Sequence, residues 1–355
     1  MSADANRDTQ LSDIEISIEI LRGAPTEERV RALIDLAQAA EEADANPPFS
    51  EQTVVELHKA AEAADPGPGA EADSGSSTDT SGTHSHGLHI AYAWGDKPSD
   101  TAEDTLLTGA GIVVEGDTGS PDVVEMVVRP NCRQHGIGSR LAAALADDVL
   151  APQPDRIQRA WAHGGHDAAA RLANRYGWGP VRELWRMRLT SLEDVPEPRL
   201  PETVTIRPFV PGQDDAAWLH ANALAFSDHP EQGRLTQEDL DARTQEDWFS
   251  APGFLLAEED GEIIGFHWTK VHAAEEQEDA GGRAEAIGEV YVVGVVPTAQ
   301  GRGLGLSLTL AGIEHLRSKG LGAIMLYVDA DNTAAVELYR KLGFTRWDVD
   351  TMYAP

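Results

Sequence analysis

The sequence predicts an α/β protein that consists of two homologous domains in tandem, and three observations support this prediction. A strand that runs into a glycine-rich turn and then a helix occurs twice, at residues 126–138 and 293–305. Each copy is followed by the same order of predicted elements. The chain has 355 residues, a length that suggests about two domains, each large enough to bury its own core.

The glycine-rich turn of the second copy carries the most chemical information. An apolar strand at residues 293–296 leads through Gln300-Gly301-Arg302-Gly303-Leu304-Gly305 into a helix. A helix N-terminus presents unsatisfied N–H groups and about half a positive charge, so this turn predicts a cradle for a pyrophosphate. Neither the Rossmann pattern nor the phosphate-loop ending Gly-Lys-Ser/Thr fits it. In the alternative interpretation, the glycines of this turn serve only to allow tight packing.

Each turn is followed by a predicted helix, a short strand and a second helix. The predicted bounds are 141–150, 157–162 and 167–176 in the first copy, and 303–319, 323–328 and 333–342 in the second. A glycine and an aromatic residue, Gly177-Trp178 and Gly343-Phe344, close the two copies. The matching order indicates that one ancestral unit was duplicated.

Composition predicts the domain boundaries. Residues 191–203 are rich in proline and predict a stiff linker between a domain at 1–190 and a domain at 204–355. Residues 66–87 contain almost no large apolar side chains and predict a disordered loop. Residues 273–286 predict an exposed acidic hairpin loop.

Three histidines in or near the predicted disordered loop, His84, His86 and His89, raise the question of a metal site. No cysteine or clustered carboxylate with ligand spacing accompanies them, so we interpret them as solvated loop histidines. The sequence indicates neither a metal nor a redox cofactor.

The net charge of −32 argues against nucleic acid or an anionic membrane surface as a partner. Cys132 is the single cysteine, so no intramolecular disulfide can form, and we expect it to be a small buried side chain. The sequence has no secretory signal and no stretch of 18 apolar residues. We therefore expect a soluble, cytoplasmic protein. We also expect a monomer that acts on a small molecule.

Two residues of the second copy have the chemistry that amide formation from a thioester requires. Glu289 is a carboxylate within an otherwise apolar strand and is the candidate base that takes a proton from the attacking amine. Strict alternation would place it on one face with Tyr291, Val293 and Val295. Tyr339 is the candidate hydrogen-bond donor to the departing thiolate. The alternatives are a solvent-facing edge glutamate and a core tyrosine.

The first copy lacks both groups. Aligned on the glycine-aromatic pair, Ala173 corresponds to Tyr339, and aligned on the glycine turn, Asp122 corresponds to Glu289. Glu125 is out of register with Glu289. We therefore predict that chemistry occurs only in the C-terminal domain and that the N-terminal domain retains a loop able to hold a cofactor.

Several segments resemble the mycothiol synthase family, which consists of tandem GCN5-related N-acetyltransferases. In the second half they are Phe266 to His272, Gly288 to Val295, Gln300 to Gly305, Leu326 to Val336 and His229 to Gly233; in the first half they are Trp161 to Gly164 and Arg182 to Leu184. The resemblance covers both domains. It implies two acyl-CoA N-acyltransferase folds, each a mixed, mostly antiparallel sheet flanked by helices.

The resemblance further implies acetyl transfer from acetyl-CoA to the cysteinyl amine of a cysteine–glucosamine–inositol pseudodisaccharide, the last step of mycothiol biosynthesis. By this resemblance Glu289 would be the base, directly or through a water, and Tyr339 the acid. The implied acetyl-CoA site of the second domain comprises Val293, Gly294, Val295, Gln300, Gly301, Arg302, Gly303, Leu304, Gly305, Leu306, Asn332, Thr333, Ala334, Ala335, Val336 and Glu337.

A second, noncatalytic acetyl-CoA site is implied in the first domain. Its residues would be Met126, Val127, Val128, Gln134, His135, Gly136, Ile137, Gly138 and Ser139. The implied substrate-binding residues are Glu51, Glu231, Lys270, Glu289 and Tyr327. Lys270 could instead be an ordinary exposed strand lysine, Glu231 could simply follow a helix end, and Glu51 could stabilise the first turn of a helix.

Two rival functions remain open from the sequence. An acetyltransferase for another primary amine, such as a peptide N-terminus or an antibiotic, would keep the glycine turn and Tyr339 without needing Glu231, Lys270 and Tyr327. A CoA-binding module without turnover would bind the nucleotide and release no thiol with any acceptor. The base and acid that occur together in one copy favour an enzyme.

Overall fold

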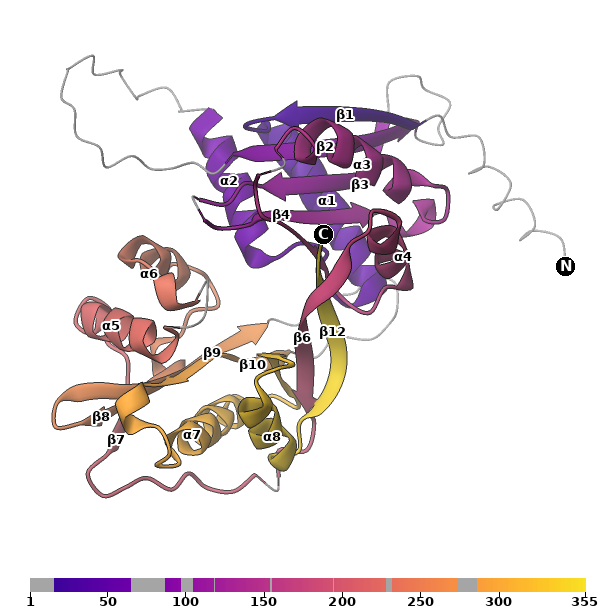
Figure 1. The fold of residues 1–355 in the computed structure, drawn as a ribbon. Helices are drawn as coiled ribbons and strands as arrows, with labels where there is room; N and C mark the ends of the chain where they lie inside the picture. The colour runs from indigo at the N-terminus through magenta and orange to yellow at the C-terminus, as the bar shows by residue number, and fades with distance from the viewer. Residues whose placement is uncertain are drawn as a thin grey trace, which may run out of the picture. The chain divides into compact units, whose positions relative to one another are not determined.

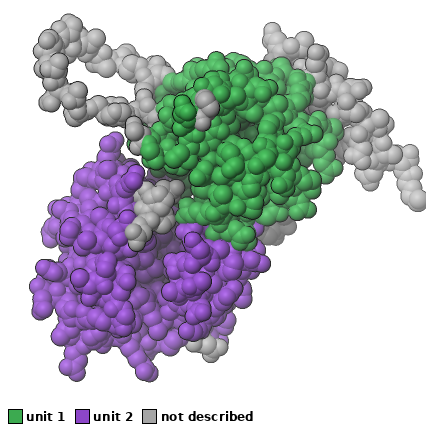
Figure 2. All heavy atoms as spheres, viewed as in Figure 1, with its two compact units in different colours: residues 1–183, 349–355 green, residues 184–348 purple. Residues whose placement is uncertain are grey.

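The computed structural model describes residues 16–64, 87–96, 105–117, 119–153, 155–193, 195–227, 232–272 and 286–355. These residues form two compact units (Figure 2). Unit 1 comprises Met1–Glu183 and Val349–Pro355, and unit 2 comprises Leu184–Asp348. The predicted disordered loop except Gly87, the predicted acidic hairpin loop except Ala286, and Glu231 lie outside the described residues.

The two units divide the chain differently from the predicted domains at two points. Residues 184–203, which comprise the end of the predicted first domain and the proline-rich linker, belong to unit 2, and the C-terminal residues Val349–Pro355 belong to unit 1. The second difference has a clear cause, because Thr351, Met352 and Tyr353 pair with a strand of unit 1. A strand contributed from the far end of the chain leaves no local signal in the sequence.

Unit 1 contains a mixed sheet in the order β1-β2-β3-β4-β5-β12, in which only the β4–β5 pair is parallel. Its strands are β1 (Ile16–Arg22), β2 (Leu88–Asp96), β3 (Thr105–Val114), β4 (Asp122–Val128), β5 (Gln158–Ala162) and the end of β12 (Thr345–Ala354). Its helices are α1 (Glu27–Asp44), α2 (Glu51–Ala64), the 3₁₀ turn η1 (Pro130–Cys132), α3 (Ile137–Leu145), the π-helix η2 (Ala146–Leu150) and α4 (Asp167–Arg175).

Strand alternation gives unit 1 two cores, one on each face of the sheet. Ile90 and Tyr92 pack with α1 and α2, whereas Ala91 and Ala93 pack with Leu141 of α3 on the other face. The helices on the two faces are visible in Figure 1. Small alanines under α3 bring this helix close to the sheet, and the glycine turn lies at its N-terminus.

Unit 2 repeats this plan in the order β6-β11-β10-β9-β8-β7, in which only the β10–β11 pair is parallel. Its strands are β6 (Gly179–Leu189, from Leu184), β7 (Thr205–Pro208), β8 (Phe254–Glu259), β9 (Glu262–His272), β10 (Ile287–Val295) and β11 (Ile324–Asp329). Its helices are α5 (Asp215–Ala225), η3 (Gln232–Arg234), α6 (Gln237–Thr244), η4 (Ala251–Gly253), η5 (Pro297–Ala299), α7 (Leu304–Ser318) and α8 (Thr333–Lys341).

Aromatic side chains dominate the core on the α5 face of unit 2. Trp218 of α5 is fully buried and makes edge contacts with Phe254, Phe266 and Trp268. These contacts fix β8 and β9 beneath α5. β9 in turn pairs with β10, which carries the candidate base.

The predicted fold class is confirmed, since both sheets are mixed, mostly antiparallel and flanked by helices. Five of the six elements predicted after the two glycine turns have the expected bounds to within two residues. The sixth is the helix predicted at residues 141–150, which differs because α3 starts at Ile137 and becomes the π-helix η2 at Ala146. Cys132 is buried as expected, and burial raises the pKa of its thiol. Within the described residues, no helix is both long and apolar enough to cross a membrane.

Candidate active site

The centre of unit 2 is a gap that opens where β10 separates from β11. The parallel pairing of these strands covers only Gly288, Glu289 and Val290. The antiparallel pairing of β10 with β9 shifts register between Val290 and Val292, so Tyr291 forms a β-bulge. Beyond the bulge, the described ladder between β10 and β11 stops. The backbone groups of β10 on that side are therefore available to pair with an extended ligand.

The bulge also decides which residues share a face with Glu289. Residues directly opposite in an antiparallel ladder point to the same face. Glu289 lies opposite Lys270, and Val293 lies opposite His267, three positions away on β9. Glu289 and Val293 therefore point to opposite faces. The prediction that Glu289 shares a face with Val293 and Val295 is wrong, because strict alternation does not survive a bulge.

Glu289 is a buried carboxylate with a hydrogen-bonding neighbour. Its residue is 5% exposed, which rules out the solvent-facing alternative. Its Oε2 atom lies 2.6 Å from Nε2 of His272, whose side chain is 35% exposed. A carboxylate that is shielded from water and hydrogen-bonded beside a strand gap can take a proton from an amine.

Lys270 lies in an aromatic environment rather than in solvent. Its residue is 8% exposed, and its Nζ atom lies 4.7 Å from the Trp248 ring centre and 5.4 Å from that of Tyr291. Nε of Arg243 also donates a hydrogen bond of 3.2 Å to the Tyr291 hydroxyl. Cation–π contacts of this kind hold an ammonium group in place. The alternative of an ordinary exposed lysine is wrong.

The glycine turn has the geometry of an anion cradle. Gly301 and Gly303 have φ angles of 75° and 79°, a region that side chains with a Cβ adopt only with strain. Gly303 precedes α7, and no side chain caps this helix, so its first N–H groups can face an anion. Arg302 makes two hydrogen bonds of 2.7 Å to Glu259. The cradle therefore depends on backbone dipoles more than on the Arg302 charge.

Tyr339 on α8 is 5% exposed and belongs to the core cluster that also contains Val290. Its ring makes an edge contact with Phe344. Burial raises the pKa of Tyr339 to about 12, so the phenol keeps its proton near neutral pH and can donate a hydrogen bond. Tyr339 is thus both a core residue and a candidate donor; the two roles are compatible.

The first turn of α8 is organised by its cap. The Asn332 side chain accepts a hydrogen bond of 3.2 Å from the Ala335 N–H, while Thr333 and Glu337 are exposed. On β11, the Tyr327 ring lies 5.5 Å from the Arg186 guanidinium. These contacts fix the start of α8 and the position of the Tyr327 ring.

Glu51 is the first residue of α2 in unit 1, and it is exposed. The Thr53 N–H donates to the Ser50 hydroxyl at 3.3 Å, which is the arrangement of a helix start. A role in stabilising the first turn therefore fits Glu51, and its role in substrate binding stays a prediction.

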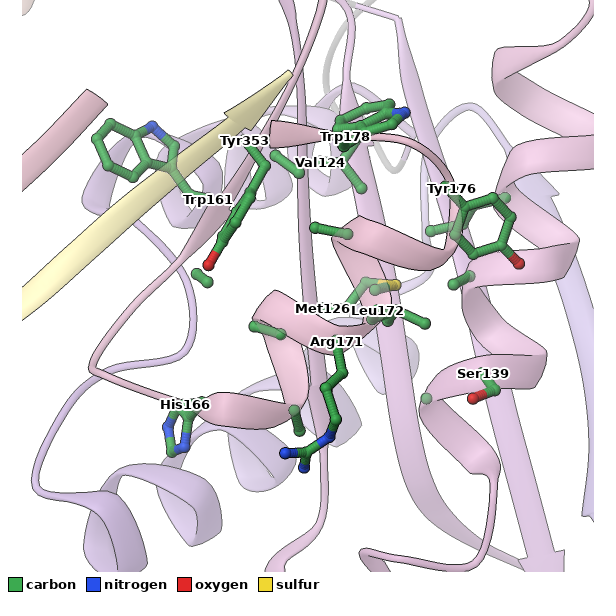
Figure 3. A pocket seen from close by; sticks show the side chains of 18 of the residues that line it. Val124, Met126, Ser139, Trp161, His166, Arg171, Leu172, Tyr176, Trp178 and Tyr353 are labelled. Atoms are coloured by element: carbon green, nitrogen blue, oxygen red, sulfur yellow. The ribbon is translucent and has the colours of Figure 1, made fainter. Parts of the chain in front are cut away.

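Unit 1 contains a cavity of about 960 Å³ at its own glycine turn (Figure 3). Gly136 precedes α3 with a φ of 80°, and again no side chain caps the helix. All the residues implied for the second acetyl-CoA site line this cavity except His135, which is exposed. Figure 3 shows Met126 and Ser139 in its wall, together with Arg171 and Tyr176 from the α4 region.

A buried polar network borders this cavity and was missed by the sequence reasoning. His163 Nε2 lies 2.8 Å from Glu125, and its Nδ1 lies 3.2 Å from Asp350. Burial alone would lower the pKa of His163, but the hydrogen bonds to Asp350 and Glu125 outweigh it and raise this pKa to about 10. Because 187 positions separate His163 from Asp350, no local pattern could have revealed the pair.

The two units can be aligned strand by strand. The parallel ladder begins at Asp122 in unit 1 and at Gly288 in unit 2, so the second residue is Val123 in one and Glu289 in the other. The predicted match of Asp122 to Glu289 is off by one residue, because the Tyr291 bulge lengthens β10. Unit 1 therefore has an apolar side chain at the position of the candidate base.

The helices after the ladders also match. The bounds of α4 and α8 place Ala173 at the position of Tyr339, as predicted. Asp122 forms an ion pair with Arg156. His89 was predicted to lie in solvent, but it belongs to β2, and its Nε2 atom lies 2.8 Å from Glu115. Unit 1 keeps the cradle and lacks both candidate catalytic groups.

Comparison with known proteins agrees with this geometry. Residues 219–344 match the Acetyltransferase (GNAT) family. The chain is 50% identical over 338 residues to a mycothiol acetyltransferase of Arthrobacter sp. (strain FB24), with 95% of each chain covered. The chain belongs to the mycothiol acetyltransferase family. A mycothiol acetyltransferase of Streptomyces coelicolor is 54% identical over 255 residues, which cover 71% of this chain and 77% of that protein.

Solved structures show the same fold. A GCN5-related N-acetyltransferase from Sphaerobacter thermophilus superposes with a TM-score of 0.59 at 24% identity and 95% coverage of both chains. A tandem GNAT protein from the clavulanic acid biosynthesis pathway has a TM-score of 0.61 at 19% identity, covering 96% of this chain and 98% of that one. As a member of this family, the chain is an acetyl-CoA-dependent N-acetyltransferase, and its two units are a tandem pair of GNAT folds.

Proposed function

We propose that this enzyme transfers the acetyl group of acetyl-CoA to the cysteinyl amine of 1D-myo-inositol 2-(L-cysteinylamino)-2-deoxy-α-D-glucopyranoside and so forms mycothiol. The observation that carries the proposal is the buried Glu289 at the point where β10 and β11 separate, in a chain of the mycothiol acetyltransferase family. We further propose that it acts in the cytoplasm as a monomer.

The residues of unit 2 fit acetyl-CoA. The stretch of β10 from Val293 to Val295, which pairs with β9 but not with β11, would bind the amides of the pantetheine arm, and the N–H groups after Gly303 would bind the pyrophosphate. Acetyl-CoA, when bound, supplies an acetyl thioester in the strand gap. The start of α8, from Asn332 to Glu337, would line the same site; Asn332, Thr333, Ala334 and Glu337 are exposed there.

Two side chains then handle the protons of the reaction. An α-amino group has a pKa of about 8, so near neutral pH the amine must lose a proton to Glu289, directly or through a water. Tyr339 keeps its own proton and donates a hydrogen bond to the sulfur as the carbon–sulfur bond breaks. Glu289 faces away from Val293, and Tyr339 packs in the cluster of Val290, so base and donor approach the gap from different faces.

Substrate recognition requires several polar groups that converge from different elements. Lys270 on β9 lies opposite Glu289 and supplies an ammonium, and Tyr327 on β11, two residues beyond the ladder partner of Glu289, supplies a phenol. A sugar–cyclitol with many hydroxyls is best held by groups of this kind. For Glu51 and Glu231, a role in binding the acceptor stays a prediction from the sequence.

We assign unit 1 a binding role without turnover. Its cavity at Gly136 would hold a second acetyl-CoA, and Val123 and Ala173 leave that site without a base or a phenol. Calorimetry of the full chain with CoA should then report two sites. A stoichiometry of one would contradict this part of the proposal.

The test of the acceptor is an assay of pure protein with acetyl-CoA and a panel of amines. We expect release of CoA thiol and acetylation of the cysteinyl pseudodisaccharide at the highest kcat/KM of the panel. A preference for a peptide N-terminus or an antibiotic would replace the proposed acceptor. Binding of CoA with no thiol release for any amine would support the non-turnover module instead.

A further inference from the structure

The strongest unassigned feature of unit 2 is the partner of the candidate base. The carboxylate of Glu289 is hydrogen-bonded through Oε2 to His272 Nε2 at 2.6 Å, at the end of β9. The Glu289 side chain is 7% exposed, whereas the His272 side chain is 35% exposed. His272 therefore connects a buried carboxylate to water.

This connection matters because a base must be reset after each turnover. A proton that moves from the amine to a buried carboxylate has to leave before the next acceptor reacts, and burial hinders its direct loss to water. Imidazole can accept a proton on one nitrogen and lose one from the other. A half-exposed histidine in contact with the carboxylate provides such a route.

We propose that His272 is a proton relay between Glu289 and solvent, a role that rests on the proposed function of Glu289 as the base. Once the Glu289 carboxyl holds the proton of the ammonium, it donates to Nε2 of the Nδ1–H tautomer of His272. The proton passes to Nε2, and the imidazolium loses its Nδ1 proton to water, which leaves Nε2–H as the donor to the carboxylate. Only N–H and O–H bonds change, and the net result is one proton moved from the substrate to solvent. Exchange with water returns His272 to the Nδ1–H tautomer for the next transfer.

The neighbouring charges are consistent with this direction of transfer. The ammonium of Lys270 lies opposite Glu289 in the ladder and is held by Trp248 and Tyr291, and Arg243 donates to the Tyr291 hydroxyl. A cation opposite the base disfavours the storage of a further positive charge there. His272 leads the proton away from Lys270 toward water.

The test separates proton transfer from orientation of Glu289. His272→Gln keeps an N–H that can donate to Glu289 but cannot carry a proton, and His272→Ala removes both properties. We expect kcat to fall about 100-fold in each variant, since general acid–base groups contribute rates of this order. Added imidazole should restore the Ala variant in proportion to its neutral fraction, while KM for acetyl-CoA stays near the wild-type value.

A matched control is available in unit 1, where His89 Nε2 lies 2.8 Å from Glu115. His89→Gln should keep the wild-type kcat and should not respond to imidazole. If His272→Gln retains the wild-type kcat, or if imidazole fails to restore His272→Ala, the relay is wrong even though the acetyltransferase function stands. If the wild-type protein itself acetylates no amine, the proposed function fails instead.

Discussion

The two units share a glycine turn and a parallel strand pair that separates, yet they differ at the residues beside the gap. Unit 2 has Glu289 and Tyr339 there, and unit 1 has Val123 and Ala173. The cradle depends on backbone conformation, which both units keep through Gly136 and Gly303. In the function we propose, chemistry depends on the side chains of Glu289 and Tyr339, which have no counterpart in unit 1. On that proposal, binding and catalysis have separate sequence requirements and can be lost separately after a duplication.

The largest expected effect comes from the base. Glu289→Gln removes the proton acceptor and keeps the shape, so we expect kcat to fall by about 10² to 10⁴-fold while the affinity for CoA is unchanged. Steady-state kinetics and calorimetry measure the two quantities. Glu262→Gln is the control, because Glu262 is an exposed carboxylate at the start of β9. A variant of Glu289 with wild-type turnover would remove the main difference between the units.

Removal of the phenol should have the next largest effect. Tyr339→Phe keeps the packing against Phe344 but deletes the hydrogen bond to the departing sulfur, and we expect kcat to fall about 10- to 100-fold. Tyr92→Phe in unit 1 is a matched control, because burial also raises the pKa of Tyr92 to about 12. Equal losses in the two variants would mean that Tyr339 acts through the fold and not through its hydroxyl.

The glycine turns allow the two cradles to be compared directly. An alanine at Gly303 or at Gly136 must adopt a positive φ, at a cost of about 1 to 2 kcal/mol. We expect Gly303→Ala to raise KM for acetyl-CoA about 10-fold, whereas Gly136→Ala should weaken only one of the two CoA binding events and leave KM unchanged. Calorimetry of both variants tests this difference. A rise in KM for Gly136→Ala would contradict the assignment of turnover to unit 2.

The smallest expected effect is the pH dependence of unit 1. The pKa of His163 is raised from 6.5 to about 10, so the charged imidazole stabilises the fold fully below pH 6.5. That stability is lost as the pH rises through about 10. We expect the Tm of the wild-type protein to decline by a few degrees between pH 7 and pH 10. The Tm of His163→Gln should depend less on pH. The same decline of Tm in both proteins would exclude the loss of the His163 charge as its cause.

The sequence predicted the parts of the molecule that depend on local patterns. The duplicated turn, the elements that follow it, and the match of Ala173 to Tyr339 were all visible because glycine, apolar runs and helix ends leave signals within a few residues. The burial of Glu289 followed from a single carboxylate in an apolar strand. Both domains were thus recognised from local features.

Features that join distant residues could not be predicted in this way. The Tyr291 bulge changed the face of Val293 and shifted the match of Asp122, because one extra residue in a strand has no distinctive composition. The placement of Val349–Pro355 in unit 1 and the contact of His163 with Asp350 join far ends of the chain. His272 and Glu289 lie on neighbouring strands on either side of the predicted hairpin loop. Their contact could be found only once the register of the two strands was known.

The most direct test of the central claim is mass spectrometry of the cysteinyl pseudodisaccharide after incubation with acetyl-CoA and the Glu289→Gln, Tyr339→Phe double variant, in which unit 1 is intact. We predict that the wild-type protein adds one acetyl group to the amine and that the double variant leaves the acceptor unmodified while it still binds CoA. Acetylation by the double variant at the wild-type rate would show that the chemistry does not depend on these residues of unit 2.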